Sequence, residues 1–160
     1  MARIDDEVRI QLSVLDRLLD FEPEVTSEPP ASRSKSLRQL KQALKRDLEW
    51  LLNTRRTFSV PEEMPDLADS LLAYGLPDFS TMSVRNTEDQ NDLVHALEMT
   101  LKRFEPRLED VAVGLAASSP LERALRFRID GRLKVDPVPE PVTFDTMLVL
   151  GSGNFAVKGE

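Results

Sequence analysis

The chain has 160 residues, of which 41% are hydrophobic, and this is enough for one domain with a substantial core. It has no cysteine and one histidine, which excludes disulfides, Cys/His zinc sites and cysteine nucleophiles. Its net charge of −7 argues against a nucleic-acid partner, and its apolar runs are far shorter than the roughly 20 residues of a membrane span. With an acidic N-terminus unlike a signal peptide, we expect a soluble, cytoplasmic protein without a cofactor or membrane insertion.

An amphipathic helix is predicted within residues 1–21. Leu12, Leu15 and Leu19 recur there at helical spacing, and residues 22–35 follow as a linker with three prolines and several serines. The helix either folds back onto its own domain or docks into a groove of a partner. Its spacing suits both alternatives.

The domain that we assign to residues 36–160 begins with a long helix. Ser36 and Gln39 form a capping box at its start, and leucines at steps of three and four predict a helix to about Asn53. Trp50 lies off this leucine stripe. It therefore either widens the core contact or belongs to a second contact surface.

A second long helix is predicted from a capping box at Thr87 and Gln90. It must end near residue 104, because Pro106 has no N–H and disfavours helical angles at Glu105. If the backbone is extended from Glu105 to Arg107, the carboxylate and the guanidinium project to the same side. Flanking apolar residues place this ion pair at the rim of the core, where losing one partner is costly. Between the two long helices, a short helix over 66–73 is predicted, ended by a glycine at 75 in a left-handed cap.

After Arg107 the apolar period changes from helical to two, which predicts an antiparallel sheet of three strands, with a short fourth as an alternative. The expected strands cover 111–115, 121–135 and 142–150, and the alternative fourth lies near 155–157. Two helices on one face of this sheet make an α+β domain. The second strand carries a basic row on its other face: Arg126, Arg128, Arg132 and Lys134. This row is either a solvated surface or a docking surface for an acidic protein.

Several of these segments resemble one protein family. Residues 46–56 read Arg-Asp-Leu-Glu-Trp-Leu-Leu-Asn-Thr-Arg-Arg, which resembles the signature helix of TssE, the lysozyme-like baseplate subunit of type VI secretion systems. Residues 13–18 and 74–79 resemble that family's N-terminal segment and interhelical loop. Residues 104–108 are similar to the Glu-Pro-Arg core motif, which the family shares with a baseplate wedge protein of contractile phage tails. The linker and the last ten residues match no motif of the family.

The resemblance implies a non-enzymatic structural subunit of a cytoplasmic baseplate, assembled at the inner membrane of a Gram-negative bacterium. Its partners would be the wedge subunits TssF and TssG, with TssK as a further candidate, and the sheath subunits TssB and TssC. Glu105, Pro106 and Arg107 would form its core motif. Because sheath subunits of these systems exchange extended arms, we predict that the third strand, which contains Thr146, is an open edge that recruits the sheath by strand addition.

The lysozyme-like label raises one alternative, a peptidoglycan-cleaving glycosidase. That reaction requires two carboxylates, one of them a proton donor. Glu105 is the candidate acid, but Arg107 on the same side favours its charged form, which is the wrong direction for a general acid. No phosphate loop, Ser/His/Asp set or metal-ligand cluster accompanies it, so we expect no catalytic activity.

Overall fold

The fold is described from a computed structural model, which covers residues 13–19, 33–57, 59–61, 63–79, 82–83, 86–117, 124–150 and 152–159. Leu12 and most of the predicted linker lie outside these residues. The elements, in chain order, are α1 (Val14–Leu18), α2 (Arg33–Asn53), the 3₁₀ segments η1 (Pro65–Asp69) and η2 (Leu71–Ala73), α3 (Thr87–Phe104), β1 (Leu108–Ala116), β2 (Ala124–Leu133), β3 (Glu140–Val149) and β4 (Asn154–Gly159).

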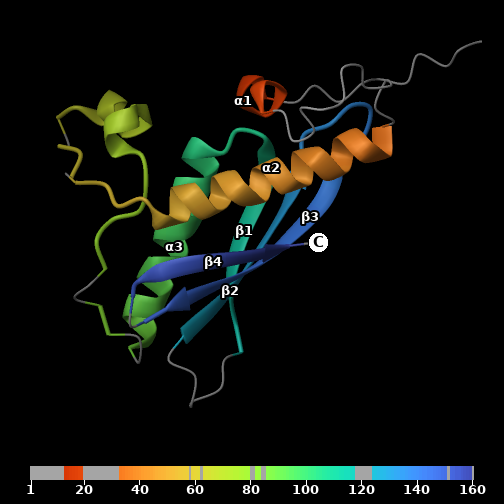
Figure 1. Ribbon diagram of the computed structural model, residues 1–160. Coiled ribbons are helices and arrows are strands. Elements are labelled where there is room, and N and C mark those ends of the chain that lie inside the picture. Colours follow the sequence, from red (N-terminus) through yellow and green to blue (C-terminus); the bar gives the residue numbers. More distant parts are fainter. Residues whose placement is uncertain are drawn as a thin grey trace, which may run out of the picture.

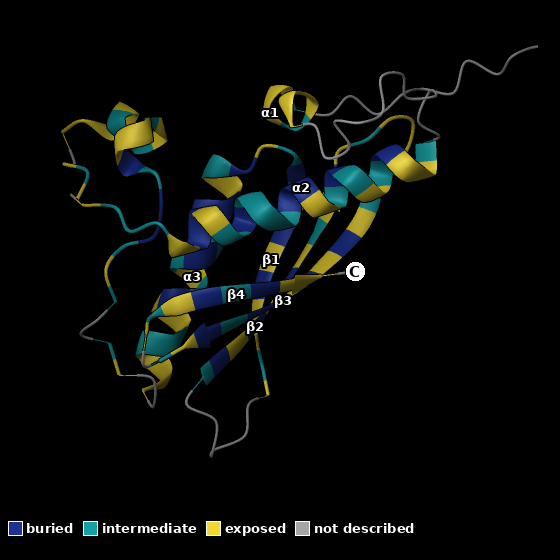
Figure 2. Cartoon of the chain, viewed as in Figure 1, coloured by how far each residue is buried: buried dark blue, intermediate teal, exposed yellow. Residues whose placement is uncertain are grey.

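The strands form one antiparallel sheet in the order β1-β2-β3-β4 (Figure 1). Buried and exposed residues alternate along each strand, so one face of the sheet is core and the other is solvent-exposed (Figure 2). Helix α3 packs next to β1 and helix α2 next to β4. The predicted α+β class, with two main helices on a small antiparallel sheet, is confirmed, and the alternative fourth strand is present.

The core lies between the two long helices and the sheet. Its most completely buried side chains come from the predicted helical stripes and from the inward parity of the strands: Leu44, Leu48, Leu52, Leu97, Leu101, Phe127, Ile129 and Phe144. Burying one such side chain stabilises the folded state by about 1.5–3 kcal/mol. The helices therefore pack on the sheet with their leucine faces.

The helix starts differ from the predictions. Helix α2 already begins at Arg33, and Ser36 is buried within its first turns instead of capping it. Helix α3 is capped by Asn86, whose side chain accepts a hydrogen bond from the N–H of Glu88 at 3.1 Å, and not by Thr87. Asn86 has the extended backbone of an N-cap, and asparagine is among the strongest residues at this position.

The predicted short helix over 66–73 is divided into η1 and η2 at Ser70. The Ser70 hydroxyl donates to the carbonyl of Leu67 at 2.6 Å, and this local bond competes with a continuous helix. Gly75 follows with the predicted left-handed backbone, at φ 103°. A Cβ at this position would lie 2.5 Å from the Thr54 carbonyl oxygen, so only glycine allows the chain to pass the end of α2 this closely.

Strand β3 is not the open edge that we predicted, because β4 pairs with it along its second half. Thr146 lies opposite Val157 of β4 and is buried on the core side of the sheet. The prediction that Thr146 recruits a sheath strand is therefore wrong. The chain's own last strand fills this edge, and it comes from the ten residues for which no motif was found.

The outer edge of β4 is in turn covered by α2. The Asn53 side chain accepts the N–H of Phe155 at 2.8 Å and donates to the Phe155 carbonyl at 2.9 Å. The Glu49 carboxylate accepts the N–H of Val157 at 3.3 Å. These side chains occupy the backbone groups that an added strand would need, so this part of the edge is closed to another chain.

Candidate functional site

The predicted core motif forms the junction between α3 and β1. Helix α3 ends at Phe104, and the N–H of Leu108 donates to the Glu105 carbonyl at 3.1 Å across Pro106 and Arg107. This bond defines a β-turn with proline at its second position, which its fixed φ favours. The backbone is therefore turned here, and not extended as we predicted.

The turn nevertheless brings the two charged side chains of the motif together. The Arg107 Nε donates to one Glu105 oxygen and its Nη2 to the other, each at 2.6 Å. Glu105 is only 4% exposed, whereas the Arg107 side chain is 25% exposed. The pair is a two-pronged, charge-assisted contact at the rim of the core, which is the geometry that guanidinium and carboxylate groups favour.

The ion pair extends into a charge network that we define by Asp16, Arg46, Asp47, Glu105 and Arg107. Arg107 Nη2 lies 2.7 Å from an Asp47 oxygen, and Arg46 Nη2 contacts the other Asp47 oxygen at 2.8 Å. Arg46 also reaches Asp16 at 2.9 Å. Three carboxylates and two guanidinium groups thus alternate, and they connect α1, α2 and the turn before β1.

The network favours the charged form of Arg107. Hydrogen bonding to Glu105 raises the pKa of Arg107 despite burial, and Asp47 adds to this effect. Tyr74 lies beside the network and stacks edge-on against Phe104, with ring centroids 5.3 Å apart. Burial raises the pKa of Tyr74, and the carboxylates of Asp47 and Glu105 raise it further. The arrangement therefore suits a fixed structural anchor.

Exposed apolar side chains flank the network where α1 meets α2. Helix α1 contacts α2 through Asp16, while Leu15 and Leu19, which we predicted to bind a partner, are exposed. Trp50 is 55% exposed, and the Arg46 guanidinium lies 5.1 Å from its ring centroid. Of the two interpretations of Trp50, the structure thus favours a second contact surface.

Protonation of Asp16 is expected to release α1 from α2. Burial acts to raise the pKa of Asp16, but the Ser13 hydroxyl and the Arg46 guanidinium outweigh it, so the pKa lies below its ordinary value of 3.8. This carboxylate stabilises the folded state above the ordinary pKa, and that contribution is lost as the pH falls through the lowered pKa. We expect an acid transition below pH 3.8 in the fluorescence of Trp50, the chain's one tryptophan.

The variant Asp16→Asn tests this assignment. At pH 7 it should already show the Trp50 fluorescence of the state in which α1 has separated from α2, and it should lack the acid transition. Asp66→Asn, at an exposed carboxyl group in η1, should behave like the unmodified chain. An unchanged acid transition in Asp16→Asn would contradict the role of Asp16.

The basic row along β2 and at its end lies on the exposed face of the sheet, and only its last residue, Lys134, contacts the network. Neighbouring strands place carboxylates beside it: Asp145 is 3.4 Å from Arg128, and Asp110 is 3.4 Å from Arg132. Arg126 also has an interaction partner. The Lys134 backbone N–H donates to the Arg107 carbonyl at 2.8 Å. The row is thus less basic than its sequence indicates, and docking of an acidic protein here stays a prediction.

The residues at the end of α2 were missed by sequence reasoning. Arg55 donates to the carbonyls of Leu52 at 2.8 Å and Gly153 at 2.6 Å. Its guanidinium lies 4.7 Å from the Phe79 ring centroid and 5.8 Å from that of Phe155, and burial lowers its pKa. Together with Asn53, Arg55 holds β4 and the turn before it against α2. The only sequence signal was that both residues lie in the signature segment.

Two kinds of site are not found in the part of the chain that the structure describes. No group of three or more acidic or histidine side chains there could hold a metal ion. Among the described helices, none has the length and apolar composition to cross a membrane.

Comparison with known proteins relates most of this chain to one family. The model of the baseplate wedge protein gp25 family matches residues 38–138, which is more than half of the chain. The chain belongs to this family. The match includes Arg46, Asp47, Glu105 and Arg107, and it confirms the resemblance to the family that TssE and the phage wedge protein share. It places this gp25-family chain among structural components of baseplates.

A search of curated proteins finds no match to this chain. Among solved structures, a chain from a structure entitled "The baseplate complex from the type VI secretion system" is similar, with 18% sequence identity and a TM-score of 0.47. The similarity covers 69% of this chain and 94% of that chain.

Proposed function

We propose that this gp25-family chain is a structural subunit of a type VI secretion baseplate, where it connects wedge subunits to the first ring of the contractile sheath. The observation that carries the proposal is the family match over residues 38–138, which contains most of the charge network. The motifs at 46–56 and 74–79 favour the type VI system over a phage tail, because they resemble TssE. The assembly would be cytoplasmic and attached to the inner membrane, with TssF, TssG and TssK on the wedge side and TssB and TssC on the sheath side.

The geometry of Glu105 supports a structural role over the alternative of a glycosidase. Both Glu105 oxygens accept hydrogen bonds from Arg107, so neither is available to carry a proton toward a glycosidic oxygen. Asp47, the carboxylate that shares Arg107 with Glu105, is likewise held by Arg46 and Arg107. Neither of these two carboxylates is therefore free to act as a proton donor or as a nucleophile.

The surface formed by α1 and Trp50 is the part of the chain that we assign to the wedge contact. Trp50 is exposed beside Arg46, and tryptophan and arginine are both enriched among the residues that dominate binding energy at protein interfaces. The network holds this surface in place, because Arg46 contacts both Asp16 of α1 and the ring of Trp50.

Site-specific photocrosslinking in assembled baseplates tests the proposal. A photoreactive amino acid in place of Trp50 should crosslink to TssF or TssG, whereas the same group in place of Lys45, on another side of α2, should give at least about tenfold less product. Crosslinks equal to the Lys45 control would overturn the assignment of this surface. Release of soluble fragments from purified peptidoglycan by the isolated chain would overturn the structural role itself.

A further inference from the structure

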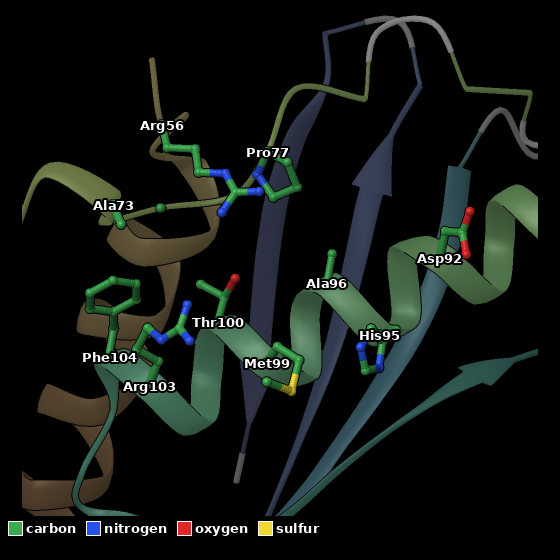
Figure 3. A pocket seen from close by; sticks show the side chains of 11 residues that line it. Arg56, Ala73, Pro77, Asp92, His95, Ala96, Met99, Thr100, Arg103 and Phe104 are labelled. Carbon is green, nitrogen blue, oxygen red and sulfur yellow. The ribbon is translucent and has the colours of Figure 1, made fainter. Parts of the chain in front are cut away.

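A groove lies between α3 and the segment from η2 to Pro77 (Figure 3). Its volume is about 350 Å³, and it is lined by Arg56, Ala73, Gly75, Pro77, Asp92, His95, Ala96, Met99, Thr100, Arg103 and Phe104. Phe104 connects it to the charge network, because its ring stacks against Tyr74. The groove is thus a surface separate from α1 and Trp50, built on the same rigid junction.

Two arginines from different elements reach this groove. Arg56 follows the end of α2, and Arg103 lies in the last turn of α3, with Thr100 between them (Figure 3). In the described part of the chain, the Arg56 guanidinium has no ion pair or hydrogen bond. Arg103 pairs with Asp69 at 2.9 Å, but the Asp69 side chain is 78% exposed, so a competing carboxylate can replace it with little loss.

The rest of the lining and the rim are largely apolar. Ala73, Pro77, Ala96, Met99 and Phe104 provide apolar surface, and Met99 is itself exposed. Leu71, 87% exposed, and the exposed Leu72 immediately precede Ala73. An exposed methionine within an apolar groove lining is typical of a protein interaction surface.

We propose that this groove binds a segment of a partner protein in which an aspartate or glutamate stands next to an apolar side chain. The carboxylate is held between Arg56 and Arg103, whose planar donors suit a two-pronged contact. The apolar neighbour packs against Met99. Charge complementarity selects this occupant, since the lining contributes two guanidinium groups and one carboxylate, Asp92, while the second nearby carboxylate, Asp69, is exposed and can be displaced from Arg103. The inference goes beyond the baseplate role and does not depend on it.

Titration of the full-length, ¹⁵N-labelled chain with two peptides tests the proposal. The first is a decapeptide of alternating leucine and aspartate, blocked at both ends, and the second replaces each aspartate by asparagine. We expect amide shift changes confined to residues 71–77 and to the groove side of α3, and binding of the asparagine peptide at least about tenfold weaker. Raising the salt concentration should weaken the binding of the aspartate peptide only, because salt screens the interaction between exposed charges.

Variants locate the binding. The double variant Arg56→Gln with Arg103→Gln should bind the aspartate peptide at least about tenfold more weakly than the unmodified chain. Lys102→Gln removes one charge from the same turn of α3, but its side chain pairs with Glu98 and does not line the groove, so we expect no change. Equal affinity for both peptides, no binding of either at about 5 mM, or shift changes mapped to α1 or the outer sheet face would each overturn the proposal. If the double variant is destabilised, the comparison of the two peptides on the unmodified chain still tests the proposal.

Discussion

Arg107→Ala is expected to lower the free energy of unfolding by about 3–5 kcal/mol and to abolish sheath assembly, because it leaves a buried carboxylate without its counter-charge. Glu105 is 4% exposed, and Arg107 makes both of its charged hydrogen bonds. The same change removes one guanidinium from Asp47 and so separates the turn from α2. The network would lose one of its two cations.

The two partners of the ion pair are expected to respond unequally. Glu105→Ala leaves Arg107 partly exposed and still paired with Asp47 at 2.7 Å, so its effect should be smaller, at about 1–3 kcal/mol. The double variant Glu105→Ala with Arg107→Ala should be more stable than Arg107→Ala alone, since no buried charge then remains unpaired. This order distinguishes a buried ion pair from a simple helix stop.

Chemical denaturation measures the stabilities, and sheath polymerisation on baseplates, below the melting temperature of each variant, measures assembly. Lys41→Ala is the matched control: the Lys41 side chain is as exposed as that of Arg107, but its partner Glu140, at 3.3 Å, is 40% exposed, so the contact should contribute at most about 1 kcal/mol. If Arg107→Ala matches this control in stability and builds normal sheaths, the pair has no special role.

Arg55→Ala is expected to have the second largest effect, a loss of about 2–4 kcal/mol. The Arg55 guanidinium makes two charge-assisted hydrogen bonds, to Leu52 at the end of α2 and to Gly153 in the turn before β4, and it makes cation–π contacts with the rings of Phe79 and Phe155. Arg55→Lys should recover little, because one ammonium group cannot reproduce the two divergent donors and the contacts with both rings.

Hydrogen exchange can locate this loss. The amides of β4, such as Ala156 and Lys158, should exchange faster in Arg55→Ala, while those in the middle of β2 should change only with global stability. Arg56→Ala is the control, since it removes the same kind of side chain from the next position but breaks no hydrogen bond of the described residues. Equal exchange of β4 in the two variants would show that Arg55 does not hold this strand.

The amino-acid sequence alone determined the main helices and strands and one half of the candidate site. Leucine spacing predicted α2 and α3, and alternating apolar residues predicted β1, β2 and β3, because burial of one face imposes these periods. Pro106 set the end of α3, and the order Glu105-Pro106-Arg107 placed two opposite charges within reach of each other. Several short motifs also indicated the family, because they resemble its segments and occur in the same order along the chain.

Only the tertiary structure decided what these elements contact. Asp47 and Arg46 join the Glu105–Arg107 pair, although 60 residues separate Asp47 from Arg107, and no local pattern signals a contact over such a distance. The same holds for β4, which closes the edge of β3 and takes its outer hydrogen bonds from Asn53, 102 residues away in the chain. A short strand with few apolar residues has a weak period. The position of such a strand depends on which backbone groups the packed helices and strands leave unpaired. These groups are known only from the folded structure.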